Sequence, residues 1–213
     1  EKRYSGCNEA LVNGQILGII LGIPFLIIGY LFCQNFIEYF LIDSKTIDEC
    51  VKYTSIQFLG ILFPISGFIF RGFYTGIQRT SIYLKVVIIS NLINAYLNLG
   101  LIFGKDSILN YFSNINIPII NKLGLLWTIF PFPKMGIEGA AIATVLASLF
   151  AFSCFFIYYF SKDIKKTFYT NKLSLNYDVI KKQLNLSWPV LKREGSIMIG
   201  FTYFLAIMGR IGT

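Results

Sequence analysis

Three asparagines interrupt one strongly apolar stretch of the chain, the segment SNLINAYLNLGLIFG at residues 90–104. Asn91, Asn94 and Asn98 are three and four residues apart, so a helix would place all of them on one face. Each carboxamide has an acceptor oxygen and two donor hydrogens, and an unsatisfied amide in an apolar environment costs free energy. The face must therefore look inward. It either bonds to neighbouring helices or lines a polar cavity, and the spacing is compatible with both.

Residues suited to covalent, acid–base or metal chemistry are few. The chain has no His, and its four cysteines lack the spacing of a metal site. Among the acids, Glu38 and Glu138 fall near the ends of apolar stretches, and Glu194 adjoins Arg193 in what we expect to be a local ion pair. Clustered acids are missing from the apolar stretches, which disfavours an integral-membrane enzyme. We therefore predict no enzymatic activity, no metal site and no resident cofactor.

The composition is that of a membrane protein. Hydrophobic residues make up 55% of the 213 residues and charged residues 14%, against about 25% charged in soluble domains. The apolar blocks do not alternate as the strands of a barrel would, so we predict an all-α, polytopic transmembrane helix bundle embedded in a lipid bilayer. Five blocks are long enough to cross roughly 30 Å of hydrocarbon as helices; they lie near residues 14–40, 53–75, 82–104, 136–160 and 187–211.

Lysine and arginine are unevenly distributed over the connecting segments. Residues 1–13, 71–85 and 161–193 fall on the same side of a five-span bundle and hold 13 of the 19 basic residues. The positive-inside rule makes this side cytosolic. The net charge of +8 is spread over separate loops instead of one face, so we predict no nucleic-acid partner.

Two connectors and the two chain ends carry further expectations. Residues 161–186 form a long basic linker and a natural boundary between two units. Residues 105–135 form an outer loop in which we expect Trp127 at headgroup level. The polar residues 1–13 show no signal-peptide pattern and are expected to form a loop. Because the chain stops within an apolar segment, we expect a piece of a longer protein.

Small residues mark the start of the fourth span. Gly139, Ala143 and Ala147 are four residues apart and form one flat stripe on a helix. Helices in lipid associate through close packing across such residues. We predict that the stripe is a packing face and that the bulkier end of the span contacts lipid, with Tyr158 and Tyr159 at the membrane interface.

Five pieces of the sequence resemble, in order, parts of one transporter family. They are RYSGCNEA, FLGILFPISGFIFRGFYTGIQRT, SNLINAYLNLGLIFG, MGIEGAAIATVLA and LSWPVLKREG. They are similar to the loop before the third helix, the fourth helix with its following loop, the fifth helix, the start of the sixth and the seventh helix of the MATE (multidrug and toxin extrusion) transporters, in the style of the DinF-like members.

The resemblance implies a twelve-helix fold with two six-helix lobes around a central cavity. Residues 1–160 would form four helices of the N-terminal lobe, 161–186 a cytosolic linker, and 187–213 the first helix of the C-terminal lobe. The remainder of the transporter chain would then be a partner of this piece. The implied activity is antiport that exports small organic compounds or xenobiotics against Na⁺ or H⁺.

The resemblance also implies roles for the asparagines. In prokaryotic relatives, an Asn on the fifth helix and an Asp one turn later are implicated in cation or proton coupling. The positions that look equivalent are Asn94 and Asn98. Asn98 stands where the relatives have the Asp and cannot titrate, which argues against proton coupling through this helix. Asn91, Asn94 and Asn98 are the predicted substrate- or ion-binding residues.

Two other functions stay open. One is a lipid-linked oligosaccharide flippase, which shares the fold of the broader superfamily. A flippase should carry cationic residues inside its helices to bind pyrophosphate, and here only Lys85 and Arg210 come close. The other is a purely structural role in the membrane.

The charge distribution predicts the orientation of the chain. A membrane-impermeant thiol reagent added from outside should label Asn114→Cys and fail to label Lys172→Cys, because residue 172 lies in the most basic connector. The reverse labelling pattern would contradict the orientation.

Overall fold

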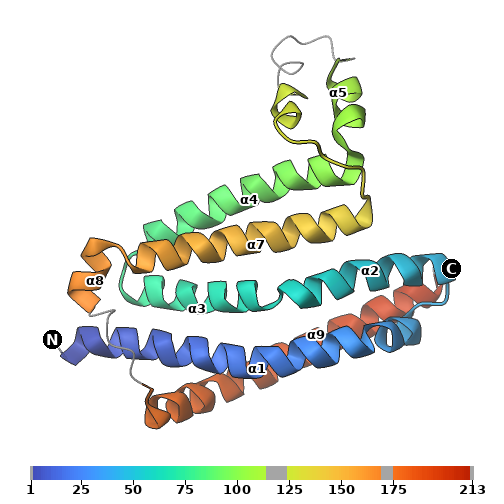
Figure 1. The fold of residues 1–213 in the computed structure, drawn as a ribbon. Coiled ribbons are helices and arrows are strands. Elements are labelled where there is room, and N and C mark those ends of the chain that lie inside the picture. The colour runs from blue at the N-terminus through green and yellow to red at the C-terminus, as the bar shows by residue number, and fades with distance from the viewer. Residues whose placement is uncertain (1, 114–123, 169–174, 212–213) are drawn as a thin grey trace.

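The chain is helical over most of its length in the computed structural model (Figure 1). No strand occurs in the part that is described, which confirms the predicted all-α helix bundle. The two labelling positions, 114 and 172, and the side chain of Arg210 lie outside this part. The structure describes residues 2–113, 124–168 and 175–211, without the side chains of residues 1–5 and 209–213.

Helix α1 (Lys2–Phe40) begins well before the apolar block that predicted it. The expectation that residues 1–13 form a loop is wrong, because the polar side chains of this segment find distant partners. The Tyr159 hydroxyl donates to Oδ1 of Asn8 at 2.5 Å, and the backbone N–H of Asn176 donates to Oδ1 of Asn13 at 2.9 Å. Both asparagines are buried. Satisfied amides can be buried without penalty, so the helix continues through them.

The predicted second span is a bent pair of helices, α2 (Ser44–Gly60) and α3 (Leu62–Gly76). Asp43 caps α2 by accepting from the Thr46 hydroxyl at 2.6 Å and from its N–H at 2.8 Å, which lowers the pKa of the Asp43 carboxyl. The axes of the two helices differ by 49°. Pro64 has no N–H to donate to the carbonyl of Gly60, four residues earlier, so the backbone ladder breaks at this point.

The remaining elements are α4 (Thr80–Phe103), α5 (Lys105–Ser113), the short 3₁₀ helix η1 (Gly124–Thr128), α7 (Ile137–Tyr159), α8 (Lys162–Phe168) and α9 (Tyr177–Ile211). Within the described ranges, α1, α4 and α7 are long and apolar enough to cross a membrane, and the bent pair makes a fourth span if counted as one. These helices support an integral, multi-pass membrane protein. Helix α9, the expected fifth span, does not reach the same apolarity in its described part.

Helix α9 also begins at Tyr177, before the predicted residue 187, and α8 forms within the predicted linker. The start of α9 is fastened to α1. Asn176 Nδ2 donates to Oε1 of Glu9 at 2.7 Å, and Gln183 Nε2 donates to the carbonyl of Ala10 at 2.8 Å. The division of the chain into two lobes stays a prediction.

The helices pack in a regular order. Helix α4 lies against α7, α7 lies against α2 and α3, and α1 lies between this pair and α9 (Figure 1). The described faces of α1 and α9 carry many exposed large apolar side chains, such as Phe25 and Phe204. Such faces suit contact with lipid or with further helices.

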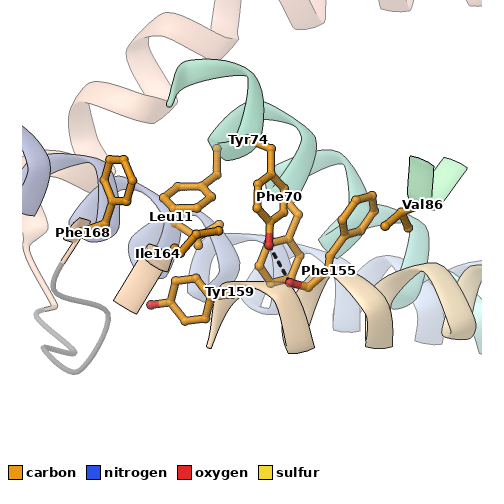
Figure 2. Packing of buried hydrophobic residues seen from close by; sticks show 9 residues of the cluster. Leu11, Phe70, Tyr74, Val86, Phe155, Tyr159, Ile164 and Phe168 are labelled. Atoms are coloured by element: carbon orange, nitrogen blue, oxygen red, sulfur yellow. Dashed lines mark hydrogen bonds between the residues drawn. The ribbon is translucent and has the colours of Figure 1, made fainter. Parts of the chain in front are cut away.

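A cluster of aromatic residues holds α3, α7 and α8 together at one end of the bundle (Figure 2). Tyr74 is fully buried and donates its hydroxyl to the carbonyl of Phe155 at 2.7 Å. The rings of Phe70 and Phe155 are stacked with centroids 5.9 Å apart. The prediction that the bulky end of α7 faces lipid is therefore wrong for Phe155 and Tyr159, which lie in this cluster, whereas Ile157 is 69% exposed.

Trp127 is buried at the opposite end of the bundle. Its indole N–H donates to the carbonyl of Tyr96 at 3.0 Å, and its ring stacks on Tyr96 and on Phe112, with centroids 5.2 and 5.6 Å away. The expected headgroup anchor is thus a packed cap over α4, because the indole finds both an apolar face and a hydrogen-bond acceptor within the protein.

The predicted packing stripe on α7 is confirmed. Gly139, Ala143 and Ala147 are all buried. A Cβ added to Gly139 would lie 2.5 Å from the backbone oxygen of Leu101 on α4. The same oxygen accepts from the N–H of Met135 at 2.8 Å, so the chain is held against α4 before α7 begins.

Because of this contact, we expect position 139 to exclude even one methyl group. Gly139→Ala should lower the free energy of unfolding by about 1–3 kcal/mol, because the added Cβ meets backbone that cannot move aside, and Gly139→Leu should prevent folding. Gly195→Ala is the matched control, since nothing lies within 4 Å of a Cβ there. Ile157→Leu, on the exposed side of α7, should also be tolerated. Equal unfolding free energies for Gly139→Ala and Gly195→Ala would show that α4 and α7 do not touch at the stripe.

Candidate functional site

Polar side chains line the contact between α4 and α7. The hydroxyl of Ser90 donates to the carbonyl of Ala147 at 2.9 Å. One turn further along, Asn94 Nδ2 lies 3.5 Å from Oγ1 of Thr144. These side chains, together with Asn98 and Ser148, are called the polar seam below. Ser90, Asn94 and Asn98 are spaced by four residues, so the seam follows one ridge of α4.

The seam brings together two of the three predicted site residues. Asn98 Nδ2 donates to Oδ1 of Asn94 at 2.8 Å, so the two carboxamides act as a linked pair. Asn94 is in turn directed at Thr144, whose hydroxyl donates to the carbonyl of Ala140 at 3.0 Å. The contact between Asn94 and Thr144 agrees with interhelical bonding, and the lining of a polar cavity by Asn94 and Asn98 stays a prediction.

Asn98 has an unpaired buried atom. Its Oδ1 is shielded from solvent and accepts no hydrogen bond from a described residue. Turning the carboxamide over would not help, because it would place two oxygens 2.8 Å apart, at Asn98 and Asn94. A buried acceptor without a partner costs about 1–3 kcal/mol. The seam can therefore accept a hydrogen bond or a cation at this oxygen.

Asn91 has a different environment from the other two asparagines. It is exposed, and its side chain makes no hydrogen bond to a described residue. It lines a groove of about 270 Å³ between α3, α4 and α7, together with Ser90 and Ser148. The single face predicted for the three asparagines thus divides into a buried pair and a groove-lining residue.

The groove is mainly apolar, and Ser90 joins it to the seam. Its other lining residues include Phe63, Pro64, Tyr83 and Phe155. Gly67 of α3 also lines the groove, and a Cβ added there would meet nothing within 4 Å. The break after α2 tilts Phe63 and Pro64 toward the same groove. An apolar wall with a few hydroxyl and amide groups is typical of sites for small organic molecules.

No charged residue lines the groove or belongs to the seam, but the guanidinium carbon of Arg71 lies 5.3 Å from the ring centroid of Tyr83, which does line the groove. Glu138 is 3.9 Å from Lys52, which also pairs with Asp48 at 3.1 Å. The ion pair expected between Glu194 and Arg193 is confirmed at 2.7 Å. Among the described residues, no group of His, Cys, Asp and Glu could hold a metal ion. The polar seam therefore contains no side chain that titrates near neutral pH.

Sequence reasoning did not single out Ser90 or Thr144 as site residues. Hydroxyl side chains are common in membrane helices, and they often bond to their own backbone, as Ser153 does to Leu149 at 2.8 Å. Only their positions opposite Asn94 and Ala147 distinguish them. The separation of four residues from Ser90 to Asn94 was the one available signal.

Comparison with known families identifies the segment that carries the asparagines. Residues 1–99 match the MatE family model. This segment belongs to the MatE family. The MatE match runs from α1 to near the end of α4 and includes all three asparagines. MatE proteins are membrane transporters and not enzymes, which agrees with the apolar helices. No curated protein and no solved structure matches this chain.

The geometry of the seam predicts a measurable coupling between Asn94 and Thr144. In a double-mutant cycle of Asn94→Ala and Thr144→Val, the coupling free energy should be about 0.6 kcal/mol, the average for hydrogen bonds in membrane proteins. The measurement is the free energy of unfolding in mixed micelles. Asn94→Ala with Ser153→Ala is the control and should be additive, because Ser153 lies more than two turns beyond Thr144 on α7 and bonds to Leu149 instead of Asn94. If the effects of Asn94→Ala and Thr144→Val on the free energy of unfolding simply add, Thr144 does not bond to Asn94 and is not part of the polar seam.

Proposed function

We propose that the chain is part of a secondary active transporter of the antiporter type, which exports small organic compounds against a Na⁺ or H⁺ gradient. The observation that carries the proposal is the unpaired buried oxygen of Asn98, beside Asn94, on a helix within the MatE segment. An unsatisfied amide at membrane depth points by default to a functional role, because a purely structural contact would satisfy its hydrogen bonds.

The groove supports an organic substrate. Its size is close to the lower limit of about 300 Å³ for ligand pockets. Aromatic rings from Phe63, Tyr83 and Phe155 offer flat apolar surface, and Asn91 offers donors and an acceptor. A flippase for pyrophosphate-linked sugars would need cationic groups, and the groove lining contains none.

The seam supports a coupling cation more than a proton. Oxygens of Asn94 and Asn98 on α4 and of Thr144 on α7 lie along the contact between the two helices, and neutral oxygens are ligands that hard cations accept. None of these groups changes its charge near neutral pH. Proton coupling would therefore need an acid outside the seam.

Asn94→Leu separates a transport role from a structural one. In the complete transporter, transport per folded molecule should fall by about tenfold, the value of one lost hydrogen bond. Ala95→Leu is the matched control. It introduces the same leucine side chain at Ala95, which is exposed on α4. The measurement is substrate flux in proteoliposomes, normalised to folded protein. If Asn94→Leu lowers only thermal stability and leaves normalised flux unchanged, the asparagines bond helices together and do nothing else.

Asn98→Asp tests the coupling ion at the same site. The variant should fold, because Asp is close to Asn in size and its protonated carboxyl can replace the donor that Asn98 offers to Oδ1 of Asn94. Its transport should become more dependent on pH, because the new carboxyl can take up a proton. Flux of both proteins is measured across pH at a fixed Na⁺ gradient. A variant whose pH profile matches that of the unaltered protein would place residue 98 outside the coupling pathway.

A further inference from the structure

A group of basic residues gathers at the end of the bundle where α3 turns into α4 and α7 ends. Lys162, Lys165 and Lys166 lie on α8, Arg79 directly precedes α4, and Lys85 lies in the second turn of α4. Figure 1 shows α8 beside the α3–α4 connection. All five side chains are exposed. These five residues are called the basic end surface.

Helix α8 is firmly attached, so its lysines have fixed positions on the surface. Ile164 and Phe168 are 3% and 8% exposed and belong to the aromatic cluster (Figure 2). The ring of Phe168 meets that of Phe73 at a centroid distance of 6.0 Å. A short helix held by two buried anchors does not need to be ordered by its ligand, which lowers the entropic cost of binding.

The charges on the basic end surface are not neutralised by any acid in the described part of the chain. None of the five residues forms an ion pair with a described acid. The only acid on α8 is Asp163, which is exposed and leaves this helix with a net charge of +2. Uncompensated cations on a rigid surface attract an anionic partner.

The depth of the surface indicates which partner this is. Helix α7 has 23 residues, which at about 1.5 Å per residue cover the roughly 30 Å hydrocarbon core. Helix α8 begins three residues after the last residue of α7, Tyr159, and α4 begins at Thr80 next to Arg79. The basic end surface therefore lies in the headgroup layer.

We propose that the basic end surface binds the phosphate headgroups of anionic phospholipids. The positive-inside rule accounts for a cytosolic location of these lysines, but it requires neither their rigid mounting on α8 nor their lack of acidic partners. Juxtamembrane lysines attract anionic lipid by an amount that corresponds to about fivefold in affinity for each residue. The inference does not depend on the proposed transport function.

The test uses the purified full chain in detergent micelles, where no membrane potential or insertion step acts. Binding of phosphatidylglycerol and of phosphatidylcholine with the same acyl chains is measured by native mass spectrometry and by thermal shift. The protein should prefer phosphatidylglycerol. Lys162→Gln/Lys165→Gln/Lys166→Gln should weaken phosphatidylglycerol binding at least tenfold. Lys162→Arg/Lys165→Arg/Lys166→Arg should retain it.

The matched control removes the same number of charges from the opposite end of the bundle. Lys45→Gln/Lys105→Gln/Lys134→Gln should bind phosphatidylglycerol as the unaltered protein does. The proposal is overturned if the α8 glutamine variant keeps its affinity, if both glutamine variants lose it equally, or if phosphatidylcholine binds as tightly. If the α8 glutamine variant fails to fold, the salt dependence of phosphatidylglycerol binding to the unaltered protein tests the proposal instead. The phosphatidylglycerol affinity should fall steeply between low and high salt, and a salt-independent affinity would overturn the proposal.

Discussion

Helices α4 and α7 meet backbone to backbone where Gly139 lies against Leu101, and the polar contacts between these two helices depend on this approach. A hydroxyl group is short, so Ser90 reaches the carbonyl of Ala147 only because no large side chain separates the two helices. The same closeness places Thr144 within reach of Asn94. In lipid, where apolar surfaces gain little by meeting each other, this dispersion contact is the main attraction between the helices.

The two ends of the bundle are held by different means. At one end, aromatic rings and the buried hydroxyl of Tyr74 join α3 to α7. At the other, Trp127 and Tyr96 close the connection between α4 and α7 through reciprocal bonds, since the Tyr96 hydroxyl donates to the carbonyl of Leu126 at 2.8 Å. The small-residue contact lies between them. Because both ends are fixed, the pair Asn94 and Asn98 has a defined position along α4.

A fixed position matters for an unpaired group. A mobile carboxamide would rotate until it found a donor, whereas Asn98 is held by its bond to Asn94 and leaves Oδ1 unsatisfied. The free energy lost there is recovered when a donor or a cation binds, which is the physical basis of a binding site in an otherwise apolar helix. The adjacent groove gives an organic molecule access to Ser90 and Asn91 on the same helix.

The sequence by itself determined the apolar helices, because hydropathy over about 20 residues is a local property. It also determined the packing stripe at Gly139, Ala143 and Ala147 and the ion pair of Glu194 with Arg193, since both follow from spacing along one helix. The asparagine ridge was predictable for the same reason. Its division into the bonded pair Asn94 and Asn98 and the groove residue Asn91 was not.

Only the tertiary structure decided the features that depend on distant partners. Helix α1 extends through Asn8 and Asn13 because Tyr159 and Asn176 satisfy their amides from the other end of the chain. Trp127 is buried because Tyr96 lies beneath it, and Phe155 belongs to the core because α3 covers it. The same residue types would face lipid or water if those partners were elsewhere. Local sequence sets what a side chain requires, and the packing of separate helices decides whether and where that requirement is met.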